Sequence, residues 1–271
     1  MLKDSKLEIT SIIDDKVEQW FPKLVEIRRN LHMYPEISNQ EFKTTEKING
    51  WLHEFGIQQI PLSLATGTAA EVKGMEQGPT VAIRADIDAL PIQEEADVPF
   101  CSKIDGVSHM CGHDVHTTIA LGAAIILEEM KDLVPGNVRI LFQPAEEFEG
   151  GAESMIQQGL LEGVSSIIGL HNVPELPVGQ IGVKEGFLMA SVDDFTLTIQ
   201  GKGGHAALPE KTIDPIVIGS AVVSQLQTLV SRTISSKESA VVTIGSFQAG
   251  MTNNVIPDKA ILKGTVRTSN E

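Results

Sequence analysis

The order of buried strands and amphipathic helices predicts an α/β fold, in which a mostly parallel sheet carries helices on both faces. Three short apolar runs have the length of buried strands, at residues 80–85, 138–142 and 165–170. A helical pattern separates each run from the next, and this alternation is typical of parallel sheets. The runs are apolar throughout, as expected when both faces of a sheet are covered.

The remaining elements of this first part are helices. Residues 6–33 have helical periodicity, and we expect Pro22 to divide them into two helices because proline lacks the N–H of a helical hydrogen bond. Residues 41–56 predict a further helix that ends at a glycine, a common terminator. Residues 116–131 predict a strongly apolar helix after the first strand, and residues 150–161 predict another after the second strand.

The pattern changes after residue 188. Residues 192–200, 240–248 and 259–268 predict strands, the first of which alternates as in a half-exposed sheet, and residues 215–234 predict a helix after the first of them. This β-α-β-β order predicts a separate α+β, ferredoxin-like domain.

We therefore expect a catalytic domain over residues 1–188 and a second domain over residues 189–271. A split βαβ unit needs one more helix and strand than the sequence supplies after its third strand. We expect the second domain to be incomplete at its C-terminal end.

Charge and hydropathy exclude several classes of partner. The 271 residues include 21 basic and 36 acidic residues, for a formal net charge of −15. Such a surface repels phosphate backbones, so we expect no nucleic-acid partner. We also expect no membrane partner, because no stretch approaches the roughly 18 apolar residues of a spanning helix. The polar N-terminus lacks the apolar centre of a secretory signal, which predicts a cytoplasmic protein.

Metal-binding residue types follow the predicted strands and one predicted turn. They are Asp86 and Asp88 after the first strand, Glu146 and Glu147 after the second, His171 after the third, and Cys111 and His113 in the turn before the apolar helix. The carboxyl ends of parallel strands meet at one edge of a sheet, so we expect these side chains to lie close together. Thiolate, imidazole and carboxylate together suit zinc, manganese or cobalt.

The neighbouring glutamates Glu146 and Glu147 predict a hydrolytic site. One of them would bind a metal, while the other would take a proton from water. Taken alone, a pair of glutamates is usually solvated surface, and His171 alone is more often a hydrogen-bonded core residue. Their joint occurrence at successive strand ends favours the metal site.

Seven motifs in order resemble a known family. They are RRNLHMYPEIS-x-x-E, RADIDALP, HMCGHDVHT, FQPAEE, GLH, GKGGHAALP and TNNVIPDKA-x-LKGTVRT. They are similar to the amidohydrolase branch of the aminoacylase/carboxypeptidase G clan of metallopeptidases. That branch includes hippurate hydrolase, N-acetyldiaminopimelate deacetylase and the plant auxin-conjugate hydrolases. The resemblance extends from about residue 28 to the end of the chain.

The resemblance implies a site for two divalent metal ions. It gives the ligand positions to Cys111, His113, Glu147 and His171, with the Cys111 thiolate bridging, and it makes Glu146 the general base. Asp86 and Asp88 would hold the ligands in place without binding the metal. His116 fits a supporting role better than a ligand role.

The resemblance also implies that the second domain is a lid that forms a homodimer. His205 would reach the active site of a partner subunit and stabilise the oxyanion there. Asn254 and Arg267 would hold the backbone and the carboxylate of the substrate. The reaction implied is hydrolysis of the amide bond of an N-acyl amino acid or a similar small amide.

Two alternatives remain open. The first is a dipeptidase or aminopeptidase of the same clan, which would recognise a free amino group. The second is a metal-binding or dimerisation fragment without turnover, because members of the family run longer and supply one further histidine ligand from the additional segment.

Overall fold

The structure, a computed structural model, describes residues 2–148 and 150–269. Residues 1, 149, 270 and 271, which fall inside the predicted domains, lie outside the described residues. The chain splits into two compact units, Met1–Glu175 and Leu176–Glu271. A functional boundary between residues 188 and 189 stays a prediction.

The first unit contains a five-stranded sheet with the order β1-β2-β4-β3-β5. Its strands are β1 (Gln58–Ile60), β2 (Thr68–Lys73), β3 (Glu76–Asp86), β4 (Pro135–Gln143) and β5 (Val164–Gly169). β3 pairs in parallel with β4 and β5, whereas β2 is antiparallel to both β4 and β1. The prediction of a mostly parallel sheet is therefore wrong for the side of the sheet that contains β1 and β2. A short connection joins β1 to its neighbour β2, and parallel neighbours would need a longer crossover. The connection from β2 to β3 is also short, but β4 lies between these two strands.

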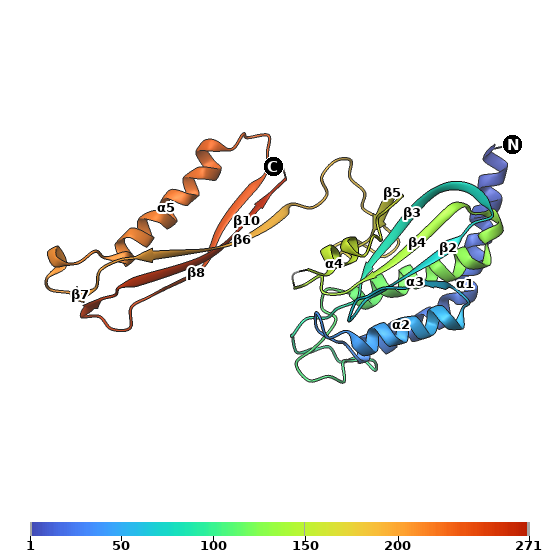
Figure 1. Cartoon of the computed structure of the whole chain (residues 1–271), viewed down its shortest axis with the longest axis horizontal. Helices are drawn as coiled ribbons and strands as arrows, with labels where there is room; N and C mark the ends of the chain where they lie inside the picture. Colours follow the sequence, from blue (N-terminus) through green and yellow to red (C-terminus); the bar gives the residue numbers. More distant parts are fainter. Residues whose placement is uncertain (1, 149, 270–271) are drawn as a thin grey trace. The chain divides into compact units, whose positions relative to one another are not determined.

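Helices cover both faces of this sheet (Figure 1). On one face, α1 (Leu2–Met33), α2 (Phe42–Glu54) and α3 (His113–Glu129) contribute side chains to a core around Phe142, while α4 (Gly151–Gln157) contributes Met155 to a smaller core around Leu141. Phe142 and Leu141 are adjacent in β4, so they point to opposite faces. The short 3-10 helix η1 (Lys131–Leu133) leads into β4. Helices on both faces were predicted from the sequence.

α1 passes through Pro22 without interruption, so the prediction of two helices there is wrong. The physical reason lies in α3. Lys16 Nζ and Trp20 Nε1 contact the two carboxyl oxygens of Glu129 at 2.6 and 3.2 Å, and Leu24 packs against the core just after the proline. Packing on both sides of Pro22 outweighs the lost hydrogen bond.

The second unit has an α+β architecture, as predicted. Strands β6 (Ser191–Gln200), β8 (Ala240–Ala249) and β10 (Lys259–Thr268) form an antiparallel sheet with β10 in the centre, and α5 (Pro215–Thr233) packs on it. Asp214 caps α5, since its Oδ1 accepts the N–H of Ile216 at 2.8 Å. A small ribbon pairs β7 (Gly204–His205) with β9 (Val255–Ile256), and η2 (Pro209–Lys211) follows β7. Among the described residues, no helix has both the length and the apolar character needed to cross a bilayer.

Candidate metal centre

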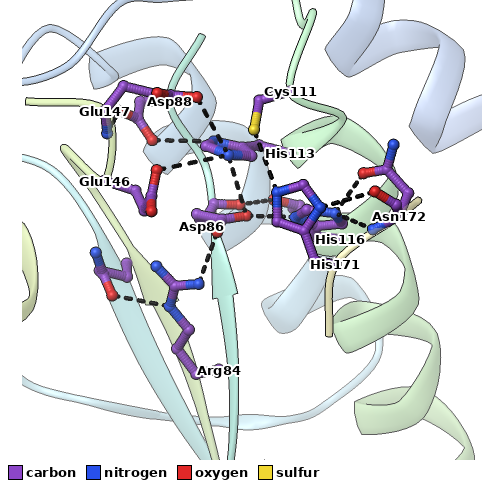
Figure 2. Close-up of polar contacts among 12 residues, drawn as sticks. Arg84, Asp86, Asp88, Cys111, His113, His116, Glu146, Glu147, His171 and Asn172 are labelled. Carbon is purple, nitrogen blue, oxygen red and sulfur yellow. Dashed lines mark hydrogen bonds and ion pairs between the residues drawn. The ribbon is translucent and has the colours of Figure 1, made fainter. Parts of the chain in front are cut away.

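Parallel pairing gathers the predicted donor residues at one edge of the first unit's sheet. β3 ends at Asp86, β4 is followed by Glu146 and Glu147, and β5 is followed by His171. Because β3 lies between β4 and β5 and runs parallel to both, all three carboxyl ends point the same way. The start of α3 brings His113 to the same place, and Figure 2 shows these side chains around one centre.

A glycine permits the close approach that begins α3. Gly112 has a φ of +85°, and a Cβ atom there would lie 2.2 Å from Oδ1 of Asn172. Any other residue would displace the Asn172 side chain and would be strained at this φ. The tight turn therefore places Cys111 and His113 against the residues that follow β5.

His113 is the centre of the donor cluster. Its ring is fully buried, and Nδ1 lies 3.1 Å from Oδ1 of Asp88. Among the residues that the structure describes, Nε2 has no hydrogen-bond partner, although Asp86 and Glu147 lie 3.7 Å away and Glu146 lies 3.9 Å away. An unsatisfied buried nitrogen that faces three carboxylates at these distances is costly without a further partner. A divalent cation fits this place, because both nitrogen and carboxylate oxygen are suitable ligands.

A second set of donors includes the thiol. Sγ of Cys111 lies 3.3 Å from Nε2 of His171, and Nδ1 of His171 donates to the carbonyl oxygen of Asn172 at 2.7 Å. That bond leaves Nε2 as the ring nitrogen with a lone pair facing the thiol. Cys111, His113 and His171 offer ligand atoms within 4.8 Å of one another, and so do His113, Glu146 and Glu147. Two such sets suit two neighbouring metal ions.

His116 and Asp86 form a hydrogen-bonded pair next to the donor cluster. Nδ1 of His116 lies 2.6 Å from Oδ1 of Asp86, and its Nε2 accepts the N–H of Asn172 at 3.0 Å. Both ring nitrogens of His116 therefore have protein partners. Asp86 also binds Arg84, whose Nη1 lies 2.7 Å from Oδ2. Burial alone would raise the pKa of Asp86, but the His116 hydrogen bond and the charges of His113 and Arg84 lower it.

Asp88 fixes three parts of the cluster at once. One oxygen contacts His113, and the other accepts the Ser38 hydroxyl at 2.6 Å and the Glu147 N–H at 3.0 Å. Burial favours the neutral acid, but these hydrogen bonds outweigh it and lower the pKa of Asp88 to about 2. The ionised carboxylate can thus orient both an imidazole and the backbone of the glutamate pair.

Without a cation, the electrostatics of the cluster are unfavourable. Burial and the carboxylates of Glu147 and Glu146 raise the pKa of the Cys111 thiol to about 12. Burial and the charge of Glu147 also raise the pKa of Glu146. Since a bound divalent ion adds the largest local charge, it would reverse these shifts and favour the thiolate. The excess of negative charge is therefore further support for a cation site.

The sequence did not point to Asn172 or Ser38 as part of this centre. Asn172 directly follows His171, and its side-chain Oδ1 lies 2.6 Å from Nε2 of His116. Ser38 belongs to the first of the seven motifs. Their positions next to predicted site residues or inside a motif were the available signals, but neither residue type is specific enough to predict a role.

The other three predicted residues lie in the second unit. His205 is exposed, and its Nδ1 accepts the Ala207 N–H at 3.1 Å. Asn254 is its neighbour, because the Asn254 carbonyl accepts the Ala206 N–H at 3.0 Å. Arg267 is not brought to them. β10 begins at Lys259, shortly after β9 and its pairing with β7. Arg267 lies eight residues further along this strand, which rises about 3.3 Å per residue.

Comparisons with known proteins point to one family of peptidases. A model of peptidase family M20/M25/M40 matches residues 82–267. N-acetylcysteine deacetylase from Bacillus subtilis is 54% identical over 247 residues, which cover 91% of this chain and 65% of the relative. N-acyl-L-amino acid amidohydrolase from Geobacillus stearothermophilus is 44% identical, with 98% of this chain and 71% of the relative covered.

A solved structure from the same family is also similar to this chain. The crystal structure of the YXEP protein of Bacillus subtilis, a dinuclear metal-binding peptidase of the M20 family, matches with a TM-score of 0.81 and 48% identity. The match covers 94% of this chain and 66% of that protein. The chain spans 65% and 59% of two deacetylases of Bacillus subtilis that it matches.

Proposed function

The chain belongs to peptidase family M20/M25/M40, and we propose that its protein is a metal-dependent hydrolase of N-acyl amino acids. One observation carries this proposal. Within residues 2–148 and 150–269, the buried Nε2 of His113 has no hydrogen-bond partner, yet three carboxylates face it at 3.7–3.9 Å. The relatives' names, an N-acetylcysteine deacetylase and an N-acyl-L-amino acid amidohydrolase, support the substrate class.

Four residues would hold two divalent ions, namely Cys111, His113, Glu147 and His171. This mixture of sulfur, nitrogen and oxygen donors suits zinc, manganese or cobalt. The bound ions would supply Lewis acidity toward a water molecule and toward the carbonyl oxygen of the substrate. Asp88 and Asp86 hold His113 and His116 through the hydrogen bonds described above.

Glu146 would move the proton in this reaction. The side chain is 40% exposed, so it can reach both solvent and the cluster. A carboxylate at this position can accept a proton from water and return it to a leaving group. Glu146 accepts a proton from the attacking water as the new C–O bond forms, and it gives that proton to the leaving nitrogen as the C–N bond breaks.

The second unit would contribute to substrate binding. By family resemblance, His205 would donate a hydrogen bond to the oxyanion in the active site of a partner subunit, and Asn254 and Arg267 would bind the substrate's backbone and carboxylate. A homodimer follows from this assignment. These roles, the lid and the cytoplasmic location stay predictions.

Substitution of the two neighbouring glutamates tests the proposal. In protein loaded with Mn²⁺, Glu146→Gln should lower kcat for an N-acetyl amino acid about 100-fold or more, because an amide cannot accept the proton of water. Its metal content should remain that of the parent, whereas Glu147→Gln should lose metal. Release of free amino acid measures turnover, and metal analysis measures occupancy.

Exposed Glu153 in α4 offers a matched control. Glu153→Gln should retain both turnover and metal. A Glu146→Gln protein that keeps a tenth of the parental rate would refute the base assignment. A parent that releases amino acids from dipeptides but not from N-acetyl amino acids would refute the substrate class.

A further inference from the structure

The connection between α1 and α2 contains a buried glutamate that the proposed mechanism does not use. Glu41 directly precedes α2 and is fully buried. A side chain at this position often caps a helix, but that of Glu41 makes no capping bond. The carboxylate of Glu36 caps α2 instead, by accepting the N–H groups of Lys43 at 3.2 Å and Thr44 at 2.8 Å.

The side chain of Glu41 reaches the turn that carries the glutamate pair. Its Oε1 accepts the N–H of Ala145 at 2.7 Å, across 104 residues of sequence. Within the described part of the chain, its Oε2 has no hydrogen-bond partner. A buried carboxylate with a single hydrogen bond lowers the stability of a fold, so Glu41 calls for a functional explanation. Its contact with the Ala145 N–H points to the turn that carries Glu146 and Glu147.

Ala145 has a backbone conformation that alanine rarely adopts. Its φ is +47°, and it is buried directly before Glu146. The turn has little room on either side, because a Cβ on Gly67 would lie 2.5 Å from Cδ of Pro144 and a Cβ on Gly151 would meet the Pro144 carbonyl oxygen. A strained residue persists only where its surroundings fix it.

This turn explains how two adjacent side chains can face one nitrogen atom. In an extended strand, successive side chains point to opposite sides. Carboxyl oxygens of Glu146 and Glu147 nevertheless lie 3.9 and 3.7 Å from Nε2 of His113. The pair does not lie in an extended strand, because the left-handed Ala145 is followed directly by a bend at residues 146–148. Asp88 then holds the far end of the turn through the Glu147 N–H.

We propose that Glu41 is a positioning residue, which holds the Ala145 peptide so that Glu146 and Glu147 both face His113. The inference rests on the proposed function for the roles of those two glutamates. Glu41 acts through the backbone and does not touch substrate or metal. Together with Asp88, it clamps both ends of a three-residue turn with buried carboxylates.

Two substitutions at Glu41 separate positioning from packing. Glu41→Met removes the acceptor and keeps a side chain of similar length, while Glu41→Gln keeps an oxygen that can accept the Ala145 N–H. Metal-free protein titrated with Co²⁺ should bind about 10- to 100-fold more weakly in Glu41→Met, the range typical of residues that orient metal ligands. Glu41→Gln should remain within about threefold of the parent. Hydrogen exchange at the Ala145 amide should accelerate only in Glu41→Met.

Glu94 provides the matched control. It is also a buried glutamate, and it accepts the backbone N–H of Ser102 at 2.6 Å in a different part of the first unit. Glu94→Met should leave hydrogen exchange at Ala145 unchanged, even if it lowers stability. Equal Co²⁺ affinity in Glu41→Met and the parent would overturn the proposal.

A glycine at position 145 tests the backbone conformation itself. Glycine adopts positive φ without strain, so Glu41→Met should cost less Co²⁺ affinity in an Ala145→Gly background than in the parent. If Glu41→Met does not fold, Ala145→Val replaces it, because a β-branched residue disfavours this conformation. Parental Co²⁺ affinity in Ala145→Val would then overturn the proposal.

The proposed function can fail separately. A parent that binds Co²⁺ without hydrolysing N-acetyl amino acids would refute the proposed reaction, while the Co²⁺ titrations would still test Glu41. A parent that binds no Co²⁺ would refute the metal site. In that case, unchanged exchange at Ala145 in Glu41→Met would also overturn the role of Glu41, and faster exchange would support it.

Discussion

Replacing Asp88 by asparagine should destabilise the metal-free first unit by roughly 2 kcal/mol at pH 5. Burial would raise the pKa of Asp88, but hydrogen bonds from His113, Ser38 and the Glu147 backbone lower it to about 2, from an ordinary value of 3.8. One pKa unit corresponds to about 1.4 kcal/mol of differential interaction. Asparagine keeps the shape of the side chain and loses the charge that these hydrogen bonds stabilise.

The pH dependence has a definite sign. Because the pKa of Asp88 is lower in the folded state, the unfolded chain binds more protons at acidic pH. The contribution is present above pH 3.8 and is lost as the pH falls through 2, so about half of it should remain at pH 3. His113, whose pKa is raised despite its burial by the hydrogen bond with Asp88, is protonated in both states between pH 3 and 5. It therefore adds no pH dependence to the free energy of unfolding between pH 3 and 5.

Tryptophan fluorescence provides a suitable assay. Trp20 and Trp51 are the two tryptophans of the chain, and both lie in the first unit. Urea unfolding in EDTA would compare the parent, Asp88→Asn and a control substitution of the exposed Asp105 to asparagine at pH 3, 4 and 5. The difference in the free energy of unfolding between the parent and Asp88→Asn should decrease from about 2 kcal/mol at pH 5 to about 1 kcal/mol at pH 3. An equal difference at pH 3 and pH 5 would show that the charge of Asp88 is not the cause.

Two further predictions concern the metal and the second unit. Cys111→Ser should weaken Zn²⁺ binding more than Mn²⁺ binding, because a hydroxyl replaces a soft thiolate; equal losses, or the same losses in Cys101→Ser, would contradict thiolate ligation. His205→Ala should lower kcat about 100- to 1000-fold with unchanged metal content, if its imidazole is an oxyanion donor. Mixing His205→Ala with Glu146→Gln should then restore some activity, whereas mixed dimers without activity would show that His205 does not act across subunits.

Much of the fold could be predicted because local periodicity is a short-range property. The alternation of apolar strands and helices located β3, α3, β4 and β5 in order, and the helix predicted at residues 215–234 matches α5. Donor residues at the ends of parallel strands had to converge, because the sheet brings those ends to one edge. Cys111, His113 and the residues that follow the strands could therefore be named as a group from the sequence alone.

Tertiary structure decided what depends on contacts between distant residues. The antiparallel β2 and the unbroken helix through Pro22 both follow from packing partners that local patterns do not reveal. The same holds inside the site. No pattern in the sequence shows that Nε2 of His113 lacks a hydrogen bond within the described part of the chain, or that Glu41 contacts Ala145 across 104 residues. The sequence determined which chemical groups meet, whereas long-range packing determined their orientation, because a backbone angle and a buried hydrogen bond exist only once the chain has folded around them.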